Sequence, residues 1–392
     1  MVSAVVRLAA RGEGVTANGR FVPLAAPGDT LLPDGTLAAG PHRQKPPCRH
    51  FPECGGCQLQ HVDDAAYAAF IVDRIASALR AQGFDDVPIR TAHLSPPRSR
   101  RRATLHFAAR GKAVAIGFKA ERSHDIIDMR ECHILRPELF ALVEPLRRLL
   151  KGRGKAGQAA LSLIDGGVDA ALTGAEFDGL EGADALTEFA GAHRLARLSL
   201  DDGYGPQARW EPEPASVTIA GTPVPFPPGA FLQATADGEA ILAASVGEAV
   251  ADPRTTADLF AGLGTFALTL PGRVVAVEGA RDAALALKNA AGRSGRNMAV
   301  EHRDLFRRPL TTAELDGLDA VVLDPPRAGA REQVAELANS AVPRIAYVSC
   351  NPSTFAGDAR RLADGGYRLQ WVRPVGQFRW STHVELAAFF MR

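Results

Sequence analysis

The 392-residue sequence predicts an α/β protein, in which a mostly parallel sheet follows a mixed α/β segment and a small N-terminal β unit. Two short apolar runs, which are typical of buried strands, end at Asp324 and Cys350. In a parallel sheet the carboxyl ends of such strands meet at one edge. A glycine-rich turn lies between two further apolar runs in residues 256–278, as in the repeating unit of open parallel sheets. Before residue 216 the apolar runs are shorter and are interrupted by Gly and Pro. This pattern favours the small β unit and the mixed α/β segment over a parallel sheet in that part of the chain.

The composition is that of a soluble protein, with 46% hydrophobic and 23% charged residues. No run approaches 18 uncharged apolar residues, so we expect no membrane span. The N-terminal apolar stretch is too short, and too soon interrupted by Arg7, for a signal peptide. We therefore expect a cytoplasmic protein, whose five cysteines are free thiols or metal ligands rather than disulfides. The length predicts two or three domains.

Residues 1–46 read as a small β unit. Short strands are expected at 5–8, 14–15 and 19–23, followed by a turn at 26–29. The segment is too short for a complete five-stranded barrel, so we expect a partial one.

Four cysteines predict a metal site. Cys48, Cys54 and Cys57 fall within ten residues that include two adjacent glycines, and Cys132 follows later. Four thiolates on such a loop suit a [4Fe–4S] cluster or a structural zinc ion, and spacing alone does not separate the two. Unrelated buried cysteines are the alternative.

Between Arg98 and Arg136 the chain has ten Arg or Lys and four Asp or Glu, although the whole chain has a net charge of only +1. Such a local excess suits phosphate contacts, and an ordinary solvated surface is the alternative. The candidates precede a hairpin expected at 104–118, turned at Gly111-Lys112: Arg98, Arg100, Arg101 and Arg102. The helical period predicts a helix over 63–81, and three prolines suggest a linker at 206–214.

From Ser216 onward, two strands and a helix at 237–250 lead to the glycine-rich turn. The order strand, turn, helix, strand, acidic residue predicts a nucleotide-like ligand, with Gly262 and Gly264 allowing close approach and Glu278 binding ribose hydroxyls. The turn lacks the third glycine of the dinucleotide fingerprint, and with Asp258 before it and Glu278 after it, S-adenosylmethionine is favoured over NAD. Asp304 could meet the adenine, or could instead cap a helix.

Several motifs now resemble one family, the S-adenosylmethionine-dependent RNA uracil-5-methyltransferases. They stand in the family's order and at similar spacings: Phe231-Leu-Gln233, Asp258-Leu-Phe-Ala-Gly-Leu-Gly264, Val277-Glu278, Leu323-Asp-Pro-Pro-Arg327, Ser349-Cys-Asn-Pro352 and His383-Val-Glu385. The four cysteines resemble the [4Fe–4S] ligands of the branch that acts on 23S ribosomal RNA. Two departures are Thr265, where the family often has Asn, and an N-terminal unit shorter than the family's OB-like TRAM domain.

The resemblance implies a Rossmann-like methyltransferase domain with a mostly parallel seven-stranded sheet at 216–392. A central α/β RNA-binding domain with the cluster site would occupy 47–215, and a truncated TRAM-like unit 1–46. It also implies the following cofactor-binding residues: Gln233, Phe260, Gly262, Gly264, Glu278, Asp304 and Asp324.

The implied reaction is methylation of carbon 5 of a uridine in RNA. Cys350 would add to carbon 6, Glu385 would remove the carbon-5 proton, and Asp324 would hydrogen-bond the base. Ribosomal RNA is the expected substrate and transfer RNA the alternative, for a protein expected to be a monomer. Rival interpretations are a non-catalytic iron–sulfur RNA-binding or ribosome-assembly protein and an iron–sulfur redox enzyme.

Overall fold

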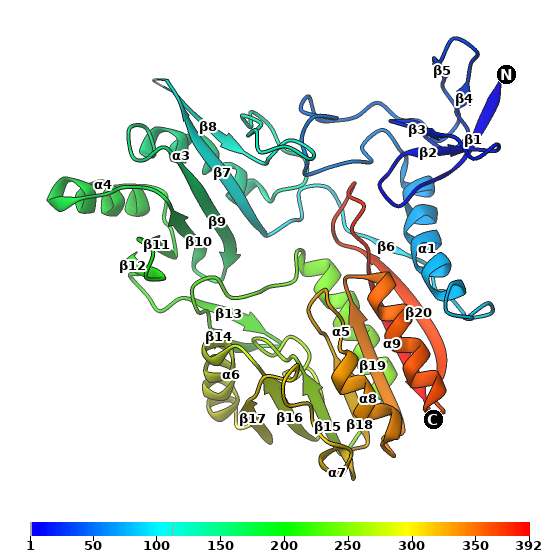
Figure 1. The fold of residues 1–392 in the computed structure, drawn as a ribbon. Helices are drawn as coiled ribbons and strands as arrows, with labels where there is room; N and C mark the ends of the chain where they lie inside the picture. The colour runs from blue at the N-terminus through cyan, green and yellow to red at the C-terminus, as the bar shows by residue number, and fades with distance from the viewer. Residues whose placement is uncertain (1, 112) are drawn as a thin grey trace. The chain divides into compact units, whose positions relative to one another are not determined.

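The computed structural model describes residues 2–111 and 113–392, and its contacts divide the chain into two compact units (Figure 1). Unit 1 comprises Met1–Phe70, Leu94–Ala215 and Phe378–Thr382, and unit 2 comprises Ile71–His93, Ser216–Gln377 and His383–Arg392. One division falls between Ala215 and Ser216, where the sequence composition changes. The three-domain division remains a prediction. Its three domains are contiguous stretches of the chain, whereas each of the two units consists of three separate segments.

The N-terminal part of unit 1 is an antiparallel sheet with the strand order β3-β2-β1-β4-β5. Its strands are β1 (Ser3–Leu8), β2 (Gly14–Thr16), β3 (Phe21–Val22), β4 (Thr30–Leu31) and β5 (Leu37–Ala38). A small core of Val5, Val22, Ala25 and Leu31 lies beneath it. Strands β4 and β5 were not predicted from the sequence, whereas β3 lies within the strand expected at 19–23.

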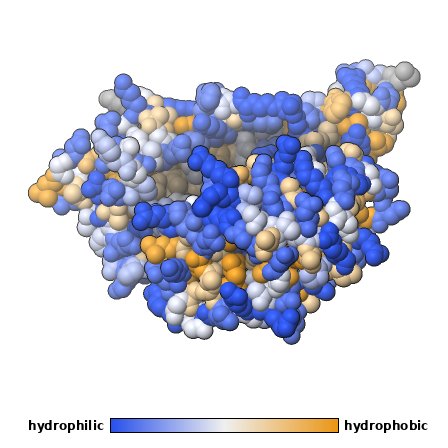
Figure 2. All heavy atoms as spheres, turned by 60° about the horizontal axis from the view of Figure 1, so that its bottom comes forward, coloured by the Kyte–Doolittle hydropathy of each residue, from blue (hydrophilic) through white to orange (hydrophobic). Residues whose placement is uncertain are grey.

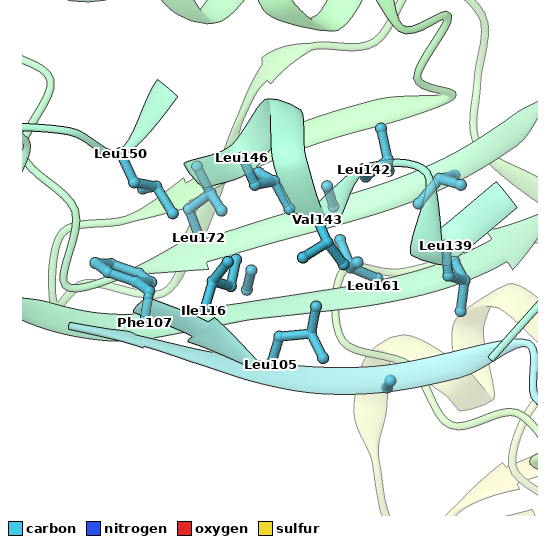
Figure 3. Close-up of a cluster of buried hydrophobic side chains, with 14 of the residues drawn as sticks. Leu105, Phe107, Ile116, Leu139, Leu142, Val143, Leu146, Leu150, Leu161 and Leu172 are labelled. Carbon is cyan, nitrogen blue, oxygen red and sulfur yellow. The ribbon is translucent and has the colours of Figure 1, made fainter. Parts of the chain in front are cut away.

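The central sheet of unit 1 has the order β12-β11-β10-β9-β7-β8. Its strands are β7 (Arg102–Arg110), β8 (Ala113–Gly117), β9 (Ala156–Ile164), β10 (Gly167–Thr173), β11 (Arg197–Asp201) and β12 (Pro206–Trp210), and its helices are α2 (Pro137–Phe140), α3 (Val143–Leu149) and α4 (Gly179–Ala192). Figure 3 shows Leu139, Val143 and Leu146 from the helices facing Leu105 and Leu161 of the sheet. This apolar layer forms the core of the unit.

Two sequence expectations for unit 1 need comment. The hairpin of β7 and β8 lies where it was expected, although Lys112 of its predicted turn is outside the described residues. The linker predicted at 206–214 is wrong, because Pro206–Trp210 forms strand β12. Proline is tolerated there because β12 is an edge strand, and the Trp210 indole N–H donates to the Leu195 carbonyl at 3.1 Å.

Unit 2 is built on a sheet with the order β17-β16-β15-β18-β19-β21-β20-β6. Its strands are β6 (His93–Leu94), β15 (Thr255–Leu259), β16 (Arg273–Glu278), β17 (Met298–His302), β18 (Ala320–Leu323), β19 (Arg344–Ser349), β20 (Arg368–Gly376) and β21 (Glu385–Met391). Strand β21 is antiparallel to both β19 and β20, and β15 to β19 are parallel. The sheet is mostly parallel as predicted, but the short edge strand β6 makes it eight-stranded.

Helices connect and cover these strands. They are α5 (Ala236–Val250), α6 (Arg281–Ser294), α7 (Thr312–Leu315), α8 (Arg331–Asn339) and α9 (Pro352–Asp364), and a separate hairpin joins β13 (Ser216–Ile219) to β14 (Thr222–Pro225). The division between the units falls within α1 (Asp64–Arg80). Helices α1 and α5 lie within two residues of their predicted bounds. The four residues of β18 are all buried, as expected of a strand covered on both faces.

Hydrophilic side chains dominate the face seen in Figure 2, with hydrophobic ones in small patches between them. Within residues 2–111 and 113–392, every helix is too short or too polar to cross a bilayer.

Candidate active site

Three candidate catalytic residues lie at one edge of the unit 2 sheet. Asp324 follows β18 and Cys350 follows β19, so both stand at carboxyl ends of parallel strands. Glu385 instead begins β21, which runs in the opposite direction. Because Ser349 pairs with Leu386, Cys350 and Glu385 lie just beyond the same pair of residues. The reversed strand therefore brings a carboxylate from its start to the edge where the other strands end.

These three residues line a pocket of about 700 Å³ within unit 2. Seven of the predicted site residues line it: Gln233, Phe260, Gly262, Glu278, Asp324, Cys350 and Glu385. Gly264 and Asp304 do not line it. The pocket thus combines the predicted cofactor residues with the predicted catalytic ones.

The glycine-rich turn forms one wall of this pocket. Gly262 has φ +56°, and a Cβ added there would meet nothing within 4 Å, so the backbone is open to a ligand. Gly264 has φ +91°, and its added Cβ would lie 2.5 Å from Leu287 of α6. Gly262 therefore leaves the wall open, whereas Gly264 allows close packing behind it.

The helix expected after this turn is absent from the described chain, since residues 262–269 form successive turns. Positive φ values at Phe260, Gly262 and Gly264 interrupt the helical conformation. The buried Asp258 carboxylate accepts the Ala267 N–H at 2.7 Å, which fixes the far side of the turn. Burial raises the pKa of Asp258 well above its usual value.

The two acidic residues predicted to hold the cofactor differ in their surroundings. Glu278 lines the pocket, and its two oxygens accept the N–H groups of Gly262 at 2.7 Å and Ala280 at 2.6 Å. Asp304 accepts the Phe306 N–H at 2.9 Å and the Arg307 N–H at 3.4 Å. It therefore stabilises a turn beside the pocket, and its contact with adenine remains a prediction.

The catalytic candidates influence one another electrostatically. The pKa of the Cys350 thiol is raised, first by burial and then by the carboxylates of Glu385 and Asp324, while Arg327 opposes this. Burial raises the pKa of Asp324 to about 7. Gln233 donates to Asp324 Oδ2 through its amide at 3.2 Å. Without a ligand, the thiol therefore favours its protonated form.

The raised pKa of Asp324 predicts a pH-dependent stability difference from the Asp324→Asn variant. Because its pKa is raised from the ordinary value of 3.8 to about 7, folded Asp324 keeps its proton between these pH values, while the unfolded chain loses it. The free energy of unfolding of the natural protein, relative to the variant, should therefore fall as pH rises through this range and then level off. Urea unfolding of both proteins at several pH values measures the difference. A difference that rises with pH would contradict the assigned environment.

Two residues of this region were not assigned from the sequence. Arg327 lines the pocket and belongs to a motif, but it had no predicted role. Gln377 follows β20, is 2% exposed, and donates to Glu385 Oε2 and to Gln233 Oε1. No local sequence pattern indicates a role for Gln377. Of its two partners, Gln233 is distant in the chain and Glu385 lies across a loop.

The four predicted cysteine ligands line a second cavity, of about 20 Å³, within unit 1. Burial raises the pKa of Cys57 to about 12 and that of Cys132 to about 11. Gln60 accepts the Cys48 N–H at 3.2 Å through its side-chain oxygen, and hydrogen-bonds the Cys57 sulfur. Among the described residues, no three His, Cys, Asp or Glu side chains converge closely enough to hold one metal ion. The four cysteines therefore share one small cavity.

The segment Phe378–Thr382, between β20 and β21, belongs to unit 1. Trp380 is 4% exposed and packs in the same core cluster as Cys57. Its carbonyl accepts the N–H groups of Gln58 at 2.8 Å and Leu59 at 2.9 Å. The cysteine loop therefore anchors this segment directly.

The four arginines proposed to contact RNA have unequal surroundings. Arg98 is exposed, and Arg101 and Arg102 are partly buried. The Arg100 guanidinium lies 5.9 Å from the Phe118 ring centre and 5.5 Å from that of Phe378. Burial lowers the pKa of Arg100, while Cys57 and Cys132 favour its charged form. Arg100 is thus placed beside the cysteine cavity, and RNA contact by the other three remains a prediction.

Comparison with known proteins is consistent with this site. Residues 253–392 match the family model of tRNA (uracil-5-)-methyltransferases. An uncharacterized RNA methyltransferase of Zymomonas mobilis is 48% identical over 99% of both chains. The 23S rRNA (uracil(1939)-C(5))-methyltransferase RlmD of Edwardsiella ictaluri is 33% identical over 90% of this chain and 83% of its own.

The fold also matches a solved structure, the Pyrococcus abyssi tRNA (uracil-54, C5)-methyltransferase in complex with S-adenosyl-L-homocysteine. The TM-score is 0.75, at 22% identity and with full coverage of both chains. With the family-model match and the relatives that align over nearly the whole chain, the protein belongs to the RNA uracil-5-methyltransferase family.

Proposed function

We propose that this enzyme transfers the methyl group of S-adenosylmethionine to carbon 5 of a uridine in 23S ribosomal RNA, through a covalent Cys350–uracil adduct. The observation that carries the proposal is the convergence of Cys350, Asp324 and Glu385 on one pocket that also includes the Gly262 turn and Glu278. The RlmD relative, named for 23S rRNA, supports ribosomal RNA as the substrate.

The chain's residues divide the reaction into steps. The Cys350 thiol gives its proton to solvent, and the thiolate sulfur adds to carbon 6 of uracil, which makes carbon 5 nucleophilic. Bound S-adenosylmethionine would supply the methyl group from its sulfonium centre, whose positive charge also favours the thiolate. Glu385 then removes the carbon-5 proton, the bond between carbon 6 and sulfur breaks, and the Cys350 thiolate is released.

Asp324 and Gln233 are suited to orient the base. Gln233 donates to Asp324, and both side chains line the pocket beside Cys350. A stacked uracil cannot reach this pocket, so the target uridine must leave its stack, as it can in a loop or single strand. Arg98, Arg101 and Arg102 are proposed to contact the RNA backbone.

The function is tested by incubating the purified protein with S-adenosylmethionine and with separate transcripts of ribosomal and transfer RNA. We expect 5-methyluridine in 23S ribosomal RNA, detected by mass spectrometry of nucleosides and located by mapping. Methylation of transfer RNA alone would replace the proposed substrate with the alternative. Absence of methylation in both would contradict the proposed reaction.

The cysteine cavity is proposed to hold a [4Fe–4S] cluster through Cys48, Cys54, Cys57 and Cys132. Cys48 and Cys57 are buried, Cys54 and Cys132 are partly buried, and all four line one cavity, which suits the four thiolate ligands of a [4Fe–4S] cluster, with a zinc ion as the alternative. A cationic metal centre would also stabilise thiolates whose pKa values burial raises. Its proposed role is structural, because methyl transfer moves no net electrons.

Cys57→Ser is expected to lose iron and sulfide and to lower the free energy of unfolding of unit 1 by about 2 kcal/mol or more, because a buried ligand is removed. Metal and sulfide analysis, with thermal unfolding, measures both effects. Cys350→Ser is the matched control, since the same change outside the cavity should retain iron. Stoichiometric zinc in the natural protein would instead support the single-ion alternative.

Further proposals concern the whole chain. We propose that residues 1–46 form a shortened OB-like unit. The proposal is supported by the five-stranded sheet of this segment, with its strand order β3-β2-β1-β4-β5. A cytoplasmic location and a monomeric state are proposed from the sequence alone.

A further inference from the structure

A row of hydrogen bonds joins the two carboxylates of the pocket. Gln233 Nε2 donates to Asp324 Oδ2 at 3.2 Å, and Gln377 Nε2 donates to Gln233 Oε1 at 2.8 Å. Gln377 Nε2 also donates to Glu385 Oε2. Gln233 and Glu385 line the pocket, whereas Gln377 is 2% exposed and lies behind them.

A backbone amide fixes the direction of this row. The Thr235 N–H, which can only donate, points at Gln377 Oε1 at 3.3 Å. The NH2 group of Gln377 must therefore face Gln233 and Glu385. With its oxygen accepting from Gln377, Gln233 must in turn present its own NH2 group to Asp324.

The position of Gln377 is fixed by packing as well. Thr235 caps α5 by accepting the Gly238 N–H at 3.1 Å. A Cβ added at Gly238 would lie 2.8 Å from the Cβ of Gln377. The first turn of α5 therefore presses on Gln377, and only glycine at position 238 leaves room for it.

We propose that Gln377 is a positioning residue, which holds the Glu385 carboxylate and the Gln233 amide in the orientations that proton removal and base binding require. This inference rests on the proposed function. Gln377 touches neither reactant and acts through the two residues it contacts. Its N–H donation to Glu385 favours the ionised carboxylate, the form that can accept the carbon-5 proton.

The variant Gln377→Glu tests the inference sharply. A carboxylate at 377 can still accept from Thr235, but it cannot donate to Glu385 or Gln233 and it adds a like charge. We expect kcat to fall about 10- to 100-fold, because an oriented general base contributes about 10²–10⁴-fold. KM for RNA should change less than threefold, and a methylated protein–RNA adduct should accumulate because proton removal is slowed.

The pH dependence separates positioning from a merely structural role. Loss of the donor and addition of a negative charge both raise the pKa of Glu385, so the acid limb of the kcat profile should move to higher pH. Gln377→Met removes the donor without adding charge, so it should shift the acid limb of the kcat profile less than Gln377→Glu does. The control is Gln370→Glu, the same change in a partly exposed residue of β20, which should leave both rate and profile unchanged.

Two outcomes are decisive. Gln377→Glu with natural kcat, natural pH profile and no accumulated adduct would overturn the inference while leaving the proposed function intact. If the natural protein methylates no RNA, the proposed function fails, and carboxyl ¹³C NMR titration of Glu385 still decides the inference. The pKa of Glu385 must then be higher in Gln377→Glu and Gln377→Met than in the natural protein, and equal values would refute the contact.

Discussion

Cys350→Ala is expected to abolish methyl transfer, lowering kcat by about 10⁴-fold or more, as loss of a catalytic nucleophile does in enzymes that use covalent catalysis. Alanine leaves carbon 6 of uracil without a nucleophile, so carbon 5 cannot attack the methyl group. Incorporation of labelled methyl groups into RNA measures the loss. S-adenosylmethionine should still bind with its natural affinity, because the glycine turn and Glu278 are unchanged.

The same variant has a second, independent readout. RNA containing 5-fluorouridine should form a stable adduct with the natural protein, since fluorine at carbon 5 cannot be removed as a proton. The adduct should be absent from Cys350→Ala. An adduct that persists in this variant would require another nucleophile and would exclude the role assigned to Cys350.

Glu385→Gln is expected to lower kcat by about 10²–10⁴-fold, the usual contribution of a general base. The amide has the shape of the carboxylate and can still accept from Gln377, so folding should be preserved. Because Cys350 can still add and carbon 5 can still be methylated, the step that stops is the loss of the carbon-5 proton. A methylated covalent complex should therefore accumulate.

Denaturing gel electrophoresis with methyl-labelled cofactor detects that complex. Glu278→Gln serves as the contrast, since a change on the proposed cofactor side should weaken cofactor binding without trapping an adduct. Release of product by Glu385→Gln at the natural rate would show that another base removes the proton.

Much of the active-site edge could be predicted from sequence because strand ends leave a local signal. Strands β18 and β19 are apolar runs that stop at Asp324 and Cys350, and a parallel sheet brings such ends together. Glu385 was found through the resemblance rather than through this rule. It begins a strand, and only the antiparallel direction of β21 brings it to the same edge.

Other features depend on contacts between distant residues, which composition and spacing do not encode. Arg100 was grouped with its basic neighbours, yet its guanidinium lies between the rings of Phe118 and Phe378 near two cysteines. Gly264 was assigned to the cofactor, yet its missing side chain leaves room for Leu287. In both cases the packing partner, rather than the local pattern, decides the role.

The anchored segment Phe378–Thr382 connects the cysteine site to the proposed general base, Glu385, along the chain. This segment is held through Trp380 by Gln58 and Leu59, next to Cys57, and it continues directly into the residues before Glu385. If metal binding at the cysteine site changes the free energy of RNA binding near Glu385, RNA binding must change the free energy of metal binding by the same amount. If an occupied cysteine site orders Phe378–Thr382 and thereby strengthens RNA binding, then bound RNA must strengthen iron binding by the same free energy.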